Sequence, residues 1–129
     1  MYKRQLVREL NKVRLPYNMN TLSQLAAGFF MDEKQAFLEQ VDRVIEERKK
    51  LYEALLEMDG IHPCPSVANF IFFSCNPDAI HIYEQFLRKG ILVKPFILPG
   101  RSRQYIRVTV GNREENEAFI EELKRIIAK

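Results

Sequence analysis

The stretch Tyr105–Gly111, which reads YIRVTVG, decides how the rest of the sequence is interpreted. Its residues alternate as in a strand with two different faces, one holding Ile106, Val108 and Val110 and the other Tyr105, Arg107 and Thr109. A guanidinium group is too costly to bury without a partner. Arg107 is therefore expected to face solvent, an acidic side chain or an anionic ligand, and the alternation alone leaves all three open.

Two further strands are expected upstream of this stretch. Residues 69–74 (NFIFFS) are nearly all apolar, which is typical of a strand buried on both faces. Residues 91–96 (ILVKPF) form the second, and Pro95 places it at an edge of the sheet or ends it early. With helices packed on one face, three mostly antiparallel strands make a two-layer α+β domain. The other face would carry aromatic rings beside Arg107, more apolar surface than a free-standing domain usually exposes.

Apolar residues at helical spacing predict five helices. They cover residues 2–14, residues 22–31, a long segment from Asp32 to Leu56, a segment from Asn76-Pro77-Asp78 to Gly90, and a segment that follows Asn112 and ends with Ile126 and Ile127. Asn20 or Thr21 can cap the second helix, which is apolar nearly all round. That helix is expected to be buried, or to pack on something absent from this chain.

Two helix starts carry the pattern of a capping box. Asp32 with Gln35 fits the start of the long helix, and Asn112 with Glu115 fits the start of the last one. Four apolar side chains of the helix before Gly90 are expected to point inward: Ile80, Tyr83, Phe86 and Leu87.

The length of the chain favours a single domain that spans residues 1–129, and its charge argues against some classes of function. The 20 basic and 17 acidic residues give a net charge of only +3 and are interspersed, so no nucleic-acid footprint is expected. Cys64 and Cys75 form no CxxC pair, and no ligand cluster suggests a metal site. No signal peptide and no membrane span stand out, so a cytoplasmic protein is expected.

Four motifs in order resemble histidinol-phosphate aminotransferases, over the carboxyl-terminal part of that family. They are NKVRLPYNMN at residues 11–20, PSVANFI at 65–71, GILVK at 90–94 and IRVTVGNREEN at 106–116. The resemblance spans nearly the whole chain and implies the small domain of a fold-type I pyridoxal-phosphate enzyme. It also implies that residues 1–31 pack on a large domain that this chain does not contain.

The resemblance implies roles for a few residues. Arg107 matches the arginine that holds the anionic group of the substrate, and a planar two-pronged donor suits a carboxylate or a phosphate. Lys94 stands where the family more often has a second arginine near the substrate phosphate. Arg14, Tyr17 and Asn18 match a loop that approaches the active site of the neighbouring subunit. No residue of this chain matches a catalytic one.

The cofactor lysine of the family lies in a serine- and glycine-rich turn for which this chain has no equivalent. The chain is therefore expected to be a fragment that supplies only substrate-anion binding and is inactive alone. The resemblance implies a homodimeric parent enzyme that holds pyridoxal phosphate. It would act on a phosphorylated amine and on amino and keto acids, exchanging an amino group between glutamate and histidinol phosphate.

Two alternatives remain open at this point. Threonine-phosphate decarboxylase, a related pyridoxal-phosphate enzyme, would look nearly the same in this region. A stand-alone α+β ligand-binding module with no catalytic parent would explain the missing lysine, although it explains the aromatic face less well.

Overall fold

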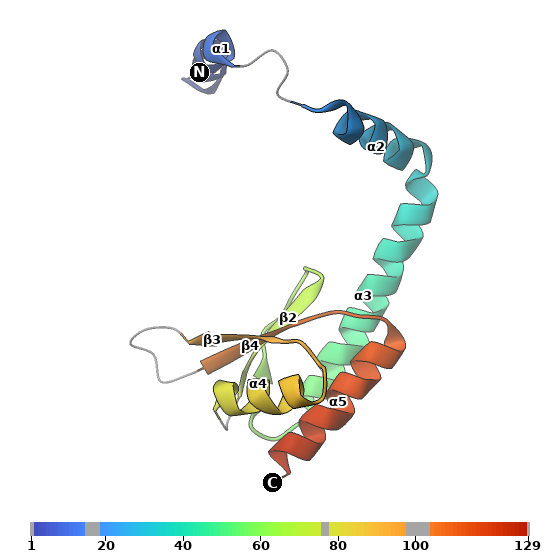
Figure 1. The fold of residues 1–129 in the computed structure, drawn as a ribbon, viewed down its shortest axis with the longest axis vertical. Helices are drawn as coiled ribbons and strands as arrows, with labels where there is room; N and C mark the ends of the chain where they lie inside the picture. The colour runs from blue at the N-terminus through green and yellow to red at the C-terminus, as the bar shows by residue number, and fades with distance from the viewer. Residues whose placement is uncertain (1, 15–18, 76–77, 98–103, 129) are drawn as a thin grey trace. The chain divides into compact units, whose positions relative to one another are not determined.

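The computed structural model describes residues 2–14, 19–75, 78–97 and 104–128. Helices and strands follow one another as α1 (Tyr2–Val13), α2 (Thr21–Asp32), α3 (Lys34–Leu56), β1 (Ile61–Pro63), β2 (Phe70–Cys75), α4 (Ala79–Arg88), β3 (Lys94–Ile97), β4 (Gln104–Thr109) and α5 (Arg113–Ile127) (Figure 1). The chain divides into two compact units, unit 1 (Met1–Leu38) and unit 2 (Glu39–Lys129). Within the described ranges, no helix has the length and apolar character needed to cross a membrane.

Unit 1 is helical and holds no buried residue among those described. Asn20 caps α2 as one of the two expected candidates, since its Oδ1 accepts a hydrogen bond from the Ser23 backbone N–H at 2.8 Å. The capping box expected from Asp32 is wrong. Asp32 is the last residue of α2, and a single residue, Glu33, separates it from α3. The apolar pattern continues across this break, so it does not reveal where one helix ends.

The sheet belongs to unit 2 and has four strands in the order β1-β2-β4-β3, all antiparallel. The α+β class is confirmed, and the expectation of three strands is wrong. The extra strand, β1, is three residues long and ends at a proline. It is too short to show the alternation of apolar and polar residues by which a strand is recognised in the sequence. It exists because it pairs with β2. β3 lies at the other edge, as Pro95 predicts.

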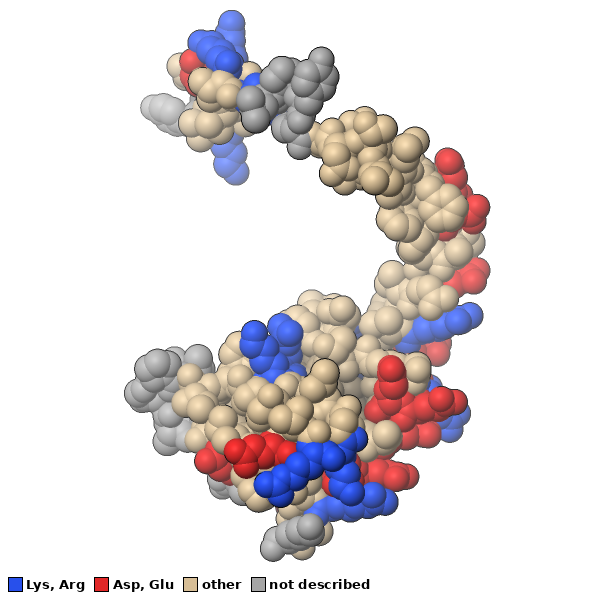
Figure 2. Space-filling view, viewed as in Figure 1, with Lys and Arg blue, Asp and Glu red and all other residues tan. Residues whose placement is uncertain are grey.

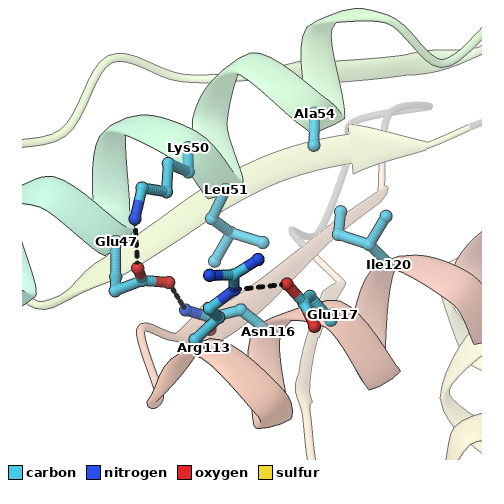
Figure 3. Close-up of a pocket in the computed structure, with 8 residues that line it drawn as sticks. All are labelled: Glu47, Lys50, Leu51, Ala54, Arg113, Asn116, Glu117 and Ile120. Atoms are coloured by element: carbon cyan, nitrogen blue, oxygen red, sulfur yellow. Dashed lines mark hydrogen bonds and ion pairs between the residues drawn. The ribbon is translucent and has the colours of Figure 1, made fainter.

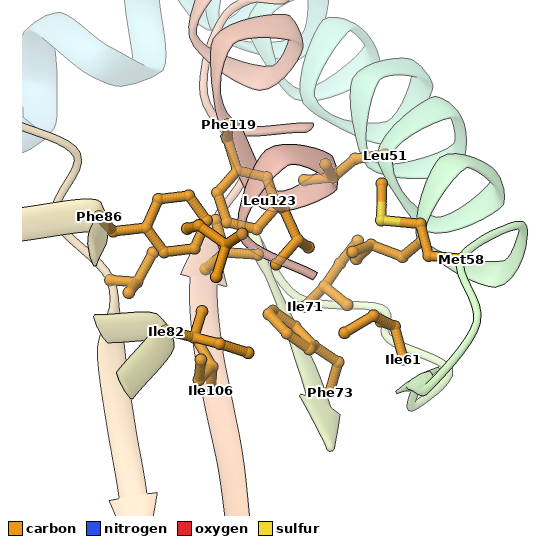
Figure 4. Close-up of a cluster of buried hydrophobic side chains, with 14 of the residues drawn as sticks. Leu51, Met58, Ile61, Ile71, Phe73, Ile82, Phe86, Ile106, Phe119 and Leu123 are labelled. Atoms are coloured by element: carbon orange, nitrogen blue, oxygen red, sulfur yellow. The ribbon is translucent and has the colours of Figure 1, made fainter. Parts of the chain in front are cut away.

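One apolar core joins the inner face of the sheet to the helices of unit 2 (Figure 4). Ile71 and Phe73 of β2 and Ile106 of β4 are fully buried, and the rings of Phe86 in α4 and Phe119 in α5 stack at 4.9 Å. The remaining core residues come from α3, α4, α5, β1, β4 and the segments next to the strands: Leu51, Leu55, Met58, Ile61, Ala79, Ile82, Val93, Val108, Val110, Leu123 and Ile126.

Two expectations about burial need correction. β2 is fully buried on one face, that of Ile71 and Phe73. On its other face Phe70 and Phe72 are half-buried, and Ser74 alone is buried. In α4 the inner stripe is Ala79, Ile82 and Phe86. Ile80 and Tyr83 are half-buried and Leu87 is exposed, so of the four side chains expected to point inward only Phe86 is fully buried.

The junction from β4 to α5 is fixed by hydrogen bonds that the sequence predicts in part. The capping box of Asn112 and Glu115 is confirmed, with both of its hydrogen bonds at 2.9 Å. A Cβ atom at Gly111 would collide with the Glu115 side chain, so the turn requires glycine at this position. The buried Asn116 accepts a hydrogen bond from the Gly111 N–H and donates one to its carbonyl, each at 3.0 Å.

Candidate anion-binding face of the sheet

Arg107 and Lys94 lie side by side on the face of the sheet opposite the helices. Arg107, in the middle of β4, is the direct partner of Lys94 in β3 and of Phe72 in β2. The register therefore brings both predicted anion-binding residues to one place, although 13 positions separate them in the sequence. Arg107 is half-buried and Lys94 is exposed, so both remain accessible to a ligand.

Each of the two cations lies over an aromatic ring. The Cζ atom of Arg107 is 5.2 Å from the ring centre of Phe70 in β2, and the Nζ atom of Lys94 is 5.5 Å from that of Phe96 in β3. Because β4 lies between β2 and β3, the two rings are on opposite sides of β4. Arg107 thus has a weak electrostatic partner on the neighbouring strand β2, and Lys94 has one on its own strand β3.

Neither cation has an acidic partner in the parts of the chain that the structure describes. Arg107 and Lys94 form no salt bridge there, and no hydrogen bond from either side chain is found. Like charges directly opposite one another on neighbouring strands destabilise a sheet. This pair therefore has an unbalanced positive charge that an anion could neutralise, and the structural alternative of an acidic partner for Arg107 finds no support among the described residues.

Aromatic rings lie beside the two cations on this face. The rings of Phe72 and Tyr105 are stacked at 4.9 Å and 11°, and Phe96 meets Phe72 edge-on at 5.2 Å. Phe72 and Phe96 are half-buried, as is Tyr105. The alternation in the sequence predicts that Tyr105 shares the face with Arg107, and it leaves open whether Phe72 or Phe73 does so. It gave no sign that Phe70 and Phe96 lie under the cations, because that depends on the register of three strands.

The other predicted site residues belong to unit 1. Arg14 is exposed and follows α1 in unit 1. Tyr17 and Asn18 lie outside the described residues, as do the Asn76-Pro77 helix start and the basic loop at residues 101–103. Their assignment to a loop near the neighbouring subunit stays a prediction.

The lysines that the structure describes do not fit a Schiff-base site for pyridoxal phosphate. Such a lysine needs an amine with a lowered pKa inside a closed site. All eight described lysines are exposed: Lys3, Lys12, Lys34, Lys49, Lys50, Lys89, Lys94 and Lys124. None of these eight lysines therefore fits the residue that would hold the cofactor covalently.

The two cysteines also offer little chemistry. Burial, with a smaller contribution from the charge of Asp78, raises the pKa of the Cys75 thiol to about 11. That thiol therefore stays protonated and weakly nucleophilic at neutral pH. Cys64 is exposed and unpaired in the structure. Within the described ranges, no group of three or more His, Cys, Asp or Glu side chains is placed to hold a metal ion.

A cleft of about 290 Å³ lies between α3 and α5 (Figure 3). Its polar side chains already contact one another: Lys50 Nζ donates to Glu47 at 2.7 Å, Asn116 Nδ2 donates to Glu47 at 3.2 Å, and Arg113 Nε donates to Glu117 at 2.7 Å. The hydrogen bonds from Lys50 and Asn116 hold the pKa of Glu47 below its ordinary value. Of these three hydrogen bonds, the one between Asn116 and Glu47 joins α5 to α3, and the other two lie within one helix each. Together they leave none of these side chains in need of a ligand.

Figure 2 shows the charged side chains on one face of unit 2. On the face shown in Figure 2, acidic and basic side chains are interspersed, and no continuous basic surface is visible. This agrees with the small net charge of +3.

Comparison with known protein families gives one match over most of the chain. The profile of the family "Aminotransferase class I and II" matches residues 1–123, which include unit 1, most of unit 2 and the whole candidate face.

Individual relatives and solved structures agree with that match. The chain is 35% identical to the histidinol-phosphate aminotransferase of Aquifex aeolicus over 126 residues, which are 97% of this chain and 36% of that protein. Its fold matches a decarboxylase from Sulfurospirillum multivorans with a TM-score of 0.82 and 25% identity, over 95% of this chain and 36% of the other.

The L-threonine-O-3-phosphate decarboxylase of Porphyromonas gingivalis shares the fold, with a TM-score of 0.72 and 22% identity over 86% of this chain and 35% of the other. The chain spans about a third of the length of the curated relatives that it matches.

Proposed function

Because the chain belongs to the class I and II aminotransferase family, we propose that it supplies substrate-anion binding to a pyridoxal-phosphate-dependent transamination. The substrates proposed are histidinol phosphate and a glutamate or 2-oxoglutarate pair, in the reaction for which its 35% identical relative is named. In this reaction the cofactor would carry the amino group. The part of this chain is to bind and orient the anionic group of the substrate.

One observation carries the proposal: Arg107 and Lys94 are direct partners on neighbouring strands and have no acidic neighbour among the described residues. A phosphate monoester carries close to two negative charges at neutral pH and has three acceptor oxygens. It can accept two parallel hydrogen bonds from the planar guanidinium of Arg107 while its charge also attracts the Lys94 ammonium. Both groups lie on strands of the sheet, which favours precise positioning.

The proposal also assigns roles to the amino-terminal residues of this chain in the parent enzyme. Residues 1–31 are to pack on the large domain, which would cover the apolar side chains of α2 that are exposed in this chain. Arg14, Tyr17 and Asn18 are to approach the active site of the neighbouring subunit in a homodimer. The parent enzyme is proposed to be cytoplasmic.

The test is an Arg107→Ala substitution in an enzyme that joins this chain to a cofactor-binding large domain. Losing a charge-assisted hydrogen bond costs roughly 1.5–3 kcal/mol. At about 1.4 kcal/mol per tenfold change, kcat/KM should fall roughly ten- to a hundredfold. The free energy of unfolding should hardly change, because Arg107 makes no ion pair within the described chain.

The matched control is Lys89→Ala, which removes an exposed cation from unit 2 at a position after α4. It should leave kcat/KM unchanged. If Arg107→Ala unfolds the protein and leaves the kcat/KM of its soluble fraction unchanged, Arg107 is a structural residue and the assignment fails.

A phosphate-ester decarboxylase is the second candidate, favoured by the match at a TM-score of 0.82 to a decarboxylase. Both candidates would use the two cations for the same phosphate group, so the face does not separate them. Assaying the joined enzyme separates them by product. Transfer of the amino group from histidinol phosphate to 2-oxoglutarate supports the first candidate, and release of CO2 from threonine phosphate without such transfer supports the second.

A third possibility is a ligand-binding module without catalysis. Such a module would bind anions but would form product in neither assay. The match of the aminotransferase family to residues 1–123 argues against it.

A further inference from the structure

We infer that Phe70 is a positioning residue: its ring holds the Arg107 guanidinium toward β2, away from Lys94, so that an anion can be bound by both cations. The inference rests on the proposed anion-binding function. It assigns a role to Phe70, for which the resemblance to the family implies none. Its physical basis is the cation–π contact between Arg107 and Phe70 at 5.2 Å.

The register of the sheet explains why a positioning residue is needed here. Lys94 is the direct partner of Arg107, and Cβ atoms of such pairs are only about 4.5–5.5 Å apart. Two long cationic side chains at that spacing repel one another and have many rotamers. Without a contact on the β2 side, nothing among the described residues would favour one arrangement of the guanidinium over another.

Phe70 is placed to supply that contact. It pairs with Thr109, so it lies diagonally across from Arg107 on the same face of the sheet. It is half-buried, and its backbone is held by the Ser66 hydroxyl, which donates to the Phe70 carbonyl at 2.6 Å. The ring is thus attached to an ordered strand, while Lys94 has a ring of its own, Phe96, on the opposite side of β4.

A guanidinium that contacts a ring through its face still has its N–H donors free in its own plane. Binding to Phe70 therefore does not compete with binding to an anion. It reduces the rotamer freedom that Arg107 would lose when the anion binds, and such preorganisation increases affinity. Phe72 differs in this respect, because its ring packs on Tyr105 and Phe96 and lies under neither cation.

The test uses the 129-residue chain and NMR of the Arg107 Nε–Hε group, assigned with an Arg107→Lys variant. Inorganic phosphate is the probe, titrated at constant ionic strength against chloride. Three variants are compared: Phe70→Leu, which keeps apolar bulk without a ring, Phe70→Tyr, which keeps the ring, and Phe72→Leu, which removes a ring of the same strand and face. Circular dichroism checks that each is folded.

The expected result is that phosphate binds the wild type and binds Phe70→Leu roughly two- to fivefold more weakly, the range that corresponds to an exposed cation–π contact. Phe70→Tyr and Phe72→Leu should match the wild type. In the absence of phosphate, the ring current of Phe70 should shift the Arg107 resonance upfield in every variant except Phe70→Leu.

Equal phosphate affinity of Phe70→Leu and the wild type overturns the inference and leaves the proposed function intact. If phosphate does not bind the wild type at all, the anion-binding function fails in this chain. The Arg107 Nε–Hε resonance of the phosphate-free protein then tests separately whether Phe70 positions Arg107. An upfield shift that is lost only in Phe70→Leu then supports the positioning of Arg107 by Phe70, and the absence of such a shift overturns it.

Discussion

Units 1 and 2 contain apolar helices of similar length whose environments differ completely. α2 in unit 1 has 12 residues, among them Leu22, Leu25 and Phe29, and none is buried. α4 in unit 2 has 10 residues and buries Ala79, Ile82 and Phe86 in a core shared with the sheet. The difference shows that the apolar content of a helix predicts a surface that needs covering, and does not predict that the cover lies in the same chain.

The largest expected effect contrasts two phenylalanines, Phe86 in unit 2 and Phe29 in unit 1. Phe86 is 0% exposed, so Phe86→Ala should lower the free energy of unfolding by about 3–5 kcal/mol through lost burial and a cavity. Phe29 is 59% exposed, and Phe29→Ala should leave it nearly unchanged. Urea unfolding followed by circular dichroism measures both.

A large loss of stability in Phe29→Ala would contradict the division into a packed unit and an uncovered one. It would mean that Phe29 is covered in solution, for which sedimentation at several concentrations tests association of the chain with itself.

A smaller effect is expected from the helix caps, where each unit offers an asparagine. Asn112 caps α5 and Asn20 caps α2. In both cases the side-chain oxygen accepts a hydrogen bond from the backbone N–H of the residue three positions later. Asn112→Ala should lower the stability of unit 2 by about 1 kcal/mol, since α5 supplies core residues. Asn20→Ala should reduce helix content without moving the main unfolding transition, because α2 supplies none.

Hydrogen exchange of the amides in α2 and α5 reads the two caps separately. Coupled losses, in which Asn20→Ala also speeds exchange in α5, would show that the units unfold together.

The smallest effect concerns pH and compares two lysine–glutamate pairs of the same spacing. In unit 2, the Glu47 side chain is 16% exposed and bonds to Lys50 and Asn116. These bonds lower its pKa in the folded chain below its ordinary value of 4.5. Its stabilising contribution is therefore fully present above pH 4.5 and is lost as pH falls through the lower, folded pKa.

Glu47→Gln should accordingly reduce the loss of stability on acidification. The matching change in unit 1, Glu9→Gln, affects a pair with Lys12 in which both side chains are more than half exposed, and it should leave the pH dependence as it is. Unfolding curves across the acidic range measure this, and an identical pH dependence for Glu47→Gln and the wild type would contradict the role given to Glu47.

The sequence predicts most of the elements of unit 2 because local signals there agree with the tertiary structure. The alternation around Arg107 gives the correct faces of β4, and the Asn112–Glu115 pattern gives the correct start of α5. Both signals arise within a few residues. Local patterns of this kind are sufficient where a strand has one buried face or a helix end has a side-chain cap.

Features that depend on distant partners were missed. β1 is defined by its pairing with β2, and its three residues carry no pattern of their own. α4 has apolar residues on two adjacent stripes, and only the position of the sheet selects the stripe of Ile82 and Phe86. In the candidate face, Arg107 could be singled out from the sequence, while the rings under the cations follow from the register of β2, β4 and β3.

A consequence for misfolding follows from the two edges of the sheet. Both edge strands contain a proline, Pro63 in β1 and Pro95 in β3. Proline has no N–H to donate, so neither edge can offer a complete row of hydrogen bonds to an added strand. Growth of the sheet into amyloid-like stacks is therefore disfavoured at both ends. When this chain aggregates, we expect the apolar helical surface of residues 21–32 to initiate it, with the sheet remaining native.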